Sequence, residues 1–172
     1  SVSSIFDNYC NRTFLDSGSD VTEYHASRSN IFMTNIWPVI SITSIKIATD
    51  YDFASAEALV SNTDYRLLHG GRYGQIMHLY LKHWYGNYPD SVEIIYRGGY
   101  CAAGVTAISG QFALPADIRE AAIIQTSFLF QKRDSVGVKS TSFNGGSIDT
   151  FAPMDLLPMV KDVLNFYRRK TL

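Results

Sequence analysis

The chain has 172 residues, of which 46% are hydrophobic and 13% aromatic, so it is long enough to bury the core of one domain and short for two. Fifteen basic and sixteen acidic residues leave a formal net charge of -1, which argues against the global positive field of a protein that reads DNA sequence. No apolar run approaches the roughly 20 residues of a membrane span.

The chain opens on the last turns of a helix. Val2, Ile5, Phe6 and Tyr9 recur at helical spacing, which predicts one apolar helix face. We expect this helix to begin before Ser1, and we expect no signal peptide. The following LDSGSD predicts a turn.

The middle of the chain, from about Val21 to Tyr100, is predicted to be mainly β. Strand-like runs are DVTEYHAS, IFM, WPVISITSIKIATD, ALVSNTDYRLL, GGRYGQIMHLYLKHW and SVEIIYRGGY. The parity of the isoleucines changes near Thr43 and Ser44, which indicates a β-bulge. The short intervals between turns predict one antiparallel sheet, and the glycines of GGRYG are expected to join two of its strands.

Residues 115–133 are predicted to form a central buried helix. A proline and an aspartate open this segment and Lys132 and Arg133 close it, as the helix dipole favours. Its apolar residues cover nearly the whole circumference, so we expect burial against the sheet on one side and against another subunit on the other. The residues assigned to this core and subunit interface are Ile118, Ala122, Ile124, Phe128 and Leu129.

The last part of the chain is predicted to be an arm that carries a helix. Residues 134–154 are rich in serine, threonine and glycine and are expected to form a loop or arm, and residues 155–170 a C-terminal helix with one apolar stripe. We expect this helix to dock on a partner protein or on a neighbouring subunit through Leu157, Val160, Val163, Leu164, Tyr167, Arg168 and Arg169. The alternative is that the stripe packs on the core of its own subunit.

One stretch comes close to a phosphate-binding loop. From Gly99 the sequence reads G-x-x-x-x-G-V-T, with Val105 where that loop has its lysine. The predicted helix also begins about ten residues too late to present its N-terminus to a phosphate. A nucleotide-handling enzyme is therefore disfavoured, and the glycines are expected to end or bulge a strand.

The other candidate residues give no catalytic or metal-binding pattern. Cys10 and Cys101 are far apart and are expected to be buried free thiols. The four histidines lack the spacing of metal ligands, and no nucleophile elbow occurs, so we expect no enzyme and no cofactor. The aromatic residues of LYLKHWYGNYPD keep open a carbohydrate- or peptide-binding β-domain, although alternation favours core rings and a protein contact.

The order of the predicted pieces resembles the head-to-tail connector, or adaptor, proteins of tailed bacteriophages. The pieces are NYCNRTF, WPVISITSIKI, TDYRLL, SVEIIYRGGY, LPADIREAA and LLPMVKDVLNFYRR, and the resemblance covers about Ile5 to Arg169. It implies an α+β structural protein of the virion neck, assembled in the host cytoplasm.

The resemblance further implies a homo-oligomeric ring, commonly a dodecamer, beneath the portal protein. Such a ring extends the DNA channel and offers a docking face to the next neck or tail protein, while DNA passes without sequence-specific contacts. A tail-completion or stopper protein of the same neck is the nearest alternative. The near-neutral charge suits a channel through which DNA slides, because a strongly basic lining would hold the phosphates.

Overall fold

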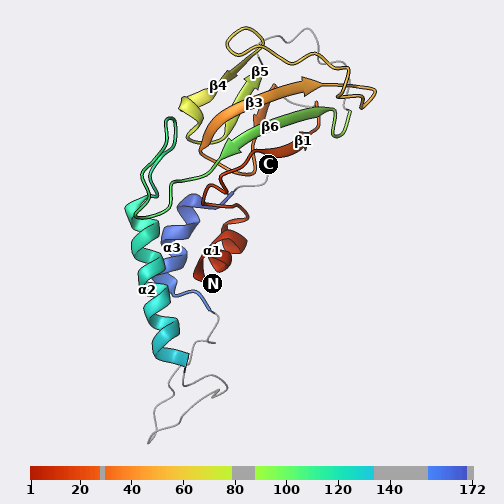
Figure 1. Cartoon of the computed structure of the whole chain (residues 1–172). Coiled ribbons are helices and arrows are strands. Elements are labelled where there is room, and N and C mark those ends of the chain that lie inside the picture. The colour runs from red at the N-terminus through yellow and green to blue at the C-terminus, as the bar shows by residue number, and fades with distance from the viewer. Residues whose placement is uncertain (28–29, 79–87, 134–154, 170–172) are drawn as a thin grey trace, which may run out of the picture. The chain divides into compact units, whose positions relative to one another are not determined.

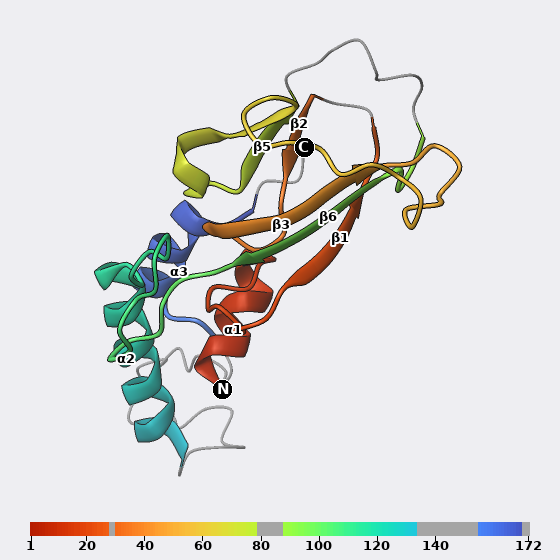
Figure 2. The same cartoon turned by 45° about the horizontal axis from the view of Figure 1, so that its top comes forward.

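The computed structural model describes residues 1–27, 30–78, 88–133 and 155–169. They group into two compact units, although the sequence predicts one domain. A helical unit combines both ends of the chain, Ser1–Asn11 and Pro115–Leu172, and a β unit contains Arg12–Leu114. Figures 1 and 2 show the helices and strands of both units, and each unit is described by itself below.

The described residues of the helical unit form three helices. They are α1 (Val2–Cys10), α2 (Ala116–Lys132) and α3 (Pro158–Tyr167), and α3 packs against both others (Figure 1). The left-handed conformation of Asn11 ends α1, and a proline in the first turn begins α3. None of the described helices is long and apolar enough to cross a bilayer. The buried side chains of this unit include Phe6, Cys10, Ile118, Ala121, Leu156, Val160 and Leu164.

The described residues of the β unit form two antiparallel three-stranded sheets, where the sequence predicts a single sheet. The first has the strand order β1-β6-β3 and the second the order β2-β5-β4. Periodicity identifies strands but not their partners, so the division into two sheets is not visible in the sequence. The strands are β1 (Val21–His25), β2 (Ile31–Met33), β3 (Val39–Ile47), β4 (Tyr65–Leu67), β5 (Gln75–His78) and β6 (Val92–Gly98).

Several local predictions within the β unit are confirmed. The register of β3 against β6 shifts between Ile42 and Ser44, at the predicted bulge, and shifts a second time between Val39 and Ser41. The 3-10 helix η1 (Leu68–Gly71) joins β4 to β5 at the predicted glycine turn. The core between the strands is apolar and aromatic, and it comprises Phe32, Val39, Ile45, Tyr65, Ile76, Val92, Ile94 and Tyr96.

A buried carboxylate ties the first sheet to the segment that follows β2. Glu23 of β1 is 7% exposed and accepts a hydrogen bond from the Tyr96 hydroxyl. Its two carboxylate oxygens also accept from the backbone N–H of Asn35, at 3.0 and 3.1 Å. His25 Nε2 lies 3.2 Å from the same carboxylate, and the Tyr96 hydroxyl accepts from the N–H of Ile36. Burial alone would raise the pKa of Glu23, but the hydrogen bonds from His25, Tyr96 and Asn35 outweigh it and lower that pKa.

Candidate assembly surfaces

The central helix α2 has a buried face and an exposed face, where the sequence predicts burial nearly all round. Ile118, Ala121 and Gln125 are buried, at spacings of three and four residues. Of the five residues assigned to the core and interface, Ile118 is 3% exposed, Ile124 is 37% exposed, and Ala122, Phe128 and Leu129 are half-buried. Ile118 therefore lies in the core of this unit, whereas Ile124 lies on its exposed face.

The buried polar residue of α2 explains how the last segment attaches. The side-chain amide of Gln125 donates to the carbonyl of Asp155 at 3.0 Å, and its carbonyl oxygen accepts from the N–H of Leu157 at 3.1 Å. A buried amide with both ends satisfied specifies one register between two segments. The sequence does not predict this role, because a single glutamine in an apolar helix is normally interpreted as a surface residue.

The apolar stripe of α3 packs within its own unit. Leu156 is 5% exposed, and Val160 and Leu164 are fully buried. The sulfur of Cys10 lies 3.5 Å from the carbonyl of Leu164, and the N–H of Arg169 donates to the carbonyl of Cys10. These contacts hold α3 against α1.

The burial of this stripe favours the alternative that α3 packs on the core of its own subunit. Val160 and Leu164 are enclosed by their own unit and cannot fill a groove on a partner. Tyr167 is also engaged, because its hydroxyl donates to the Asp117 carboxylate at 2.8 and 3.0 Å. Leu157, Val163 and Arg169 are half-buried, and Arg168 is exposed.

The exposed faces of α2 and α3 carry large apolar side chains that the structure leaves to solvent. On α2 these are Ile123, 60% exposed, and Phe130, 63% exposed, together with Ile124. On α3 they are Met159, 57% exposed, and Phe166, 87% exposed. Rows of exposed apolar side chains at helical spacing are typical of a surface that packs against another protein.

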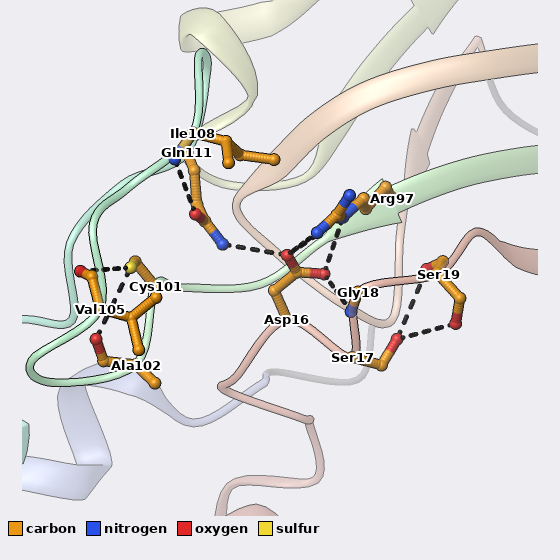
Figure 3. A network of polar contacts seen from close by, with 10 residues as sticks. All are labelled: Asp16, Ser17, Gly18, Ser19, Arg97, Cys101, Ala102, Val105, Ile108 and Gln111. Atoms are coloured by element: carbon orange, nitrogen blue, oxygen red, sulfur yellow. Dashed lines mark hydrogen bonds and ion pairs between the residues drawn. The ribbon is translucent and has the colours of Figure 1, made fainter.

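In the β unit, the chain leaving β6 is fixed by a polar network that Figure 3 shows. Asp16 receives two hydrogen bonds from Arg97 Nε at 3.0 and 3.1 Å, one from Arg97 Nη2 at 2.7 Å and one from the Gln111 amide at 3.0 Å. The hydrogen bonds from Arg97 hold the pKa of Asp16 below its ordinary value. A carboxylate with this many donors fixes three chain segments together.

The structure explains why a glycine stands at the start of the apparent phosphate loop. Gly99 has a φ of 113°, and a Cβ at this position would lie 2.5 Å from the backbone nitrogen of Asp16. Only glycine fits so close a backbone approach. The N–H of Val105 donates to the carbonyl of Ala102, and α2 begins only at Ala116. No helix begins directly after this turn, so its geometry gives no support to phosphate binding.

The remaining candidate residues occupy structural positions or lie outside the described residues. Cys10 and Cys101 are buried free thiols, as predicted. Within the described parts of the chain, no three His, Cys, Asp or Glu side chains are grouped so as to hold a metal ion. Trp84 and Tyr85, the proposed sugar- or peptide-binding aromatics, lie outside the described residues, as does the 134–154 segment.

Arg12 is a buried residue that no pattern in the sequence indicates. Arg12 is 4% exposed, its guanidinium carbon lies 3.1 Å from the ring centroid of Trp37 and 4.6 Å from that of Phe14, and it donates to the Trp37 carbonyl. A planar guanidinium stacks on aromatic rings in this manner. This arginine belongs to the NYCNRTF piece of the resemblance, and its position gives that piece a packing role.

Solved structures with a similar fold come from gene transfer agent particles. The neck of a native gene transfer agent (GTA) particle computed with C12 symmetry contains a chain that matches with a TM-score of 0.52 and 13% identity, over 99% of this chain and 79% of that chain. A chain from the neck of an empty particle computed with C6 symmetry matches with a TM-score of 0.51 and 14% identity, over 99% and 75%. A chain from the virion of the native particle has the same score and identity, over 99% and 74%.

The sequence itself matches a family model along nearly its whole length. No curated protein matches significantly. The family model of the head completion proteins, however, covers residues 1–170. This coverage includes the helical unit, the β unit and the loops between their elements. The chain therefore belongs to the head completion protein family, and its role is that of a structural protein of head completion.

Proposed function

We propose that this protein forms a ring beneath the portal protein, extends the DNA channel and joins the head to the tail. The observation that carries the proposal is the family match over residues 1–170. The similar chains of gene transfer agents support it, because two of those structures are particle necks computed with C12 and C6 symmetry. At 13 to 14% identity these similarities show the fold alone, so the ring is carried over as a proposal.

The exposed face of α2 supplies a surface on which such a ring can close. Ile123, Ile124 and Phe130 expose apolar area that isolated subunits would leave in water. Burying apolar surface contributes about 25 cal/mol per Å², so a neighbouring subunit that covers this face gains stability. In a closed cyclic ring every subunit makes this contact on both sides, so no copy of the interface is left open. We assign this face of α2 to the contact between subunits.

The exposed face of α3 is proposed as the docking element for the portal protein. Phe166 and Met159 provide apolar contacts there, and the exposed Arg168 provides a cation just after the end of α3. Arg168 lies over the ring of Tyr9, with 5.6 Å between the guanidinium carbon and the ring centroid. A guanidinium positioned in this way can pair with a carboxylate on the partner.

Electron microscopy of the purified protein, alone and mixed with a portal protein, tests the ring and its position. We expect closed rings that stack on the portal. Rings that join only the tail would assign the protein to the tail-completion or stopper alternative. A protein that stays monomeric in both preparations would overturn the proposal.

A matched pair of substitutions on α2 separates assembly from folding. Ile124→Asp places a carboxylate on the exposed face, so we expect a free energy of unfolding within about 1 kcal/mol of the wild type and a loss of rings. Ile118→Asp buries an unpaired carboxylate and should unfold the protein, at a cost of several kcal/mol. Thermal unfolding and sedimentation velocity report the two effects. Normal rings from the Ile124 variant would remove this face from the subunit contact.

A further inference from the structure

The last two turns of α2 run past the point at which α3 begins. The Tyr167 hydroxyl donates to Asp117 in the first turn of α2, and the Gln125 side chain accepts from the N–H of Leu157, just before α3. These two contacts show that α3 lies antiparallel along the first part of α2. Residues 126–133, which we call the α2 extension, continue beyond the start of α3, as Figures 1 and 2 show.

The α2 extension carries three large apolar side chains in succession. Phe128 and Leu129 are half-buried, and Phe130 is 63% exposed. At about 3.6 residues per turn, Phe128 and Leu129 point within about 60° of the buried Gln125, whereas Phe130 points about 140° away. The first two side chains therefore continue the face with which α2 packs on its own unit. Because α3 does not run alongside the described residues of the extension, this part of the face has room for a further contact.

The chain that connects α2 to α3 is far longer than the gap between its ends. Residues 134–154 lie outside the described residues and connect Arg133 to Asp155. The carbonyl of Asp155 accepts from Gln125, eight residues before Arg133, so the two ends are separated by about 12 Å along the helix axis. About five extended residues would close such a gap. The segment has 21 residues, so the connection itself does not account for most of its length.

The composition of this segment also differs from that of a simple linker. Linkers that stay in water are rich in small and polar residues, whereas large apolar side chains are stabilised by leaving water. The segment has three charged residues and six large apolar ones, which are Val136, Val138, Phe143, Ile148, Phe151 and Met154. One end of the segment attaches at Gln125, just before the α2 extension, and the other end at its last residue. The α2 extension therefore lies between the two attachment points.

We propose that residues 134–154 pack on the α2 extension of their own copy and complete the core of the helical unit. Their large apolar side chains cover Phe128 and Leu129, on the face that continues past α3. The occupant is this segment because both of its ends are attached beside that face, which gives it an effective concentration on the order of millimolar without a second copy. The opposite face, with Ile123 and Phe130, stays available for the contact between subunits. The inference goes beyond the proposed ring, because it concerns a single subunit.

Thermal unfolding of altered segments tests this contact. Phe143→Ser combined with Phe151→Ser keeps the length of the segment and removes two large apolar side chains, so we expect the melting temperature to fall by about 5 °C. Ser140→Ala is the matched control and should leave the melting temperature unchanged. Replacing residues 136–152 by Gly-Ser-Gly-Ser should also lower it. A segment without contacts predicts the opposite sign, because closing a shorter loop costs less entropy and the melting temperature would rise slightly.

Cross-linking identifies the copy that supplies the segment. A variant with Leu129→Cys and Phe143→Cys has one new thiol on each side of the contact, while the native Cys10 and Cys101 are buried. With a short bis-maleimide in dilute solution, we expect a cross-link within one chain. Dimers from a mixture of the two single variants would make a second copy the occupant and overturn the inference. An unchanged melting temperature of the double serine variant, or an equal or higher one of the shortened chain, overturns it as well. None of these results bears on the ring, which electron microscopy tests separately.

Discussion

Replacing Glu23 with alanine is expected to lower the free energy of unfolding by about 3 kcal/mol, because the change leaves several buried donors without their acceptor. The N–H of Asn35 and the hydroxyl of Tyr96 both lose a carboxylate that is 7% exposed. Urea denaturation at neutral pH measures the loss. Glu93→Gln serves as a control for removing a carboxylate from the paired strand. Among the contacts described, Glu93 makes only one, with the exposed hydroxyl of Tyr24 at 3.3 Å.

The same carboxylate gives the protein a defined dependence on pH. The folded-state pKa of Glu23 is lower than the ordinary value of 4.5. Its stabilising contribution is therefore complete above pH 4.5 and is lost as the pH falls through the folded-state pKa. The isosteric Glu23→Gln cannot ionise, so the stability difference between wild type and variant should shrink as the solution is acidified below that value. A difference that stays constant down to acid unfolding would show that folding does not lower the pKa of Glu23.

Ending the chain after Met154 is expected to unfold the helical unit. The truncation removes α3 together with the buried side chains of Leu156, Val160 and Leu164. Burial of each such side chain contributes about 1.5 to 3 kcal/mol, and the sum is comparable with the total stability of many domains. Gln125 also loses both of its partners, the Asp155 carbonyl and the Leu157 N–H. Circular dichroism on heating should show a smaller helical signal and a lower melting temperature.

A point substitution on the other face of α3 provides the matched control. Phe166 is 87% exposed, so Phe166→Ser should keep the melting temperature of the wild type. The proposed docking role predicts that this variant no longer joins DNA-filled heads that carry a portal. A truncated chain that keeps its melting temperature would contradict the structural role of α3. In that case α3 would be a docking element alone.

The sequence by itself determined most of the local structure. Helical spacing located α1, α2 and α3, alternation located the strands, and the parity change of the isoleucines located the bulge near Thr43. These features depend on residues close together in the chain, so periodicity reveals them. The order of the pieces also led to the connector proteins of phage heads, and the family match agrees with it. The single-domain organisation stays a prediction.

The tertiary structure alone decided which surfaces are inside and which are outside. Apolar residues lie all round α2, so the sequence does not reveal that Ile118 faces the core and Ile124 faces solvent. Helix periodicity does not tell how many faces of a helix other elements pack against. The stripe of α3 satisfied both the docking and the core interpretations until Val160 and Leu164 proved to be buried. The Asp16 and Arg97 pair, 81 residues apart, and the Glu23 and Tyr96 pair, 73 residues apart, arise from strand pairing and chain return. Contacts of that kind carry no periodic signal in a single sequence, and only the folded chain brings their partners together.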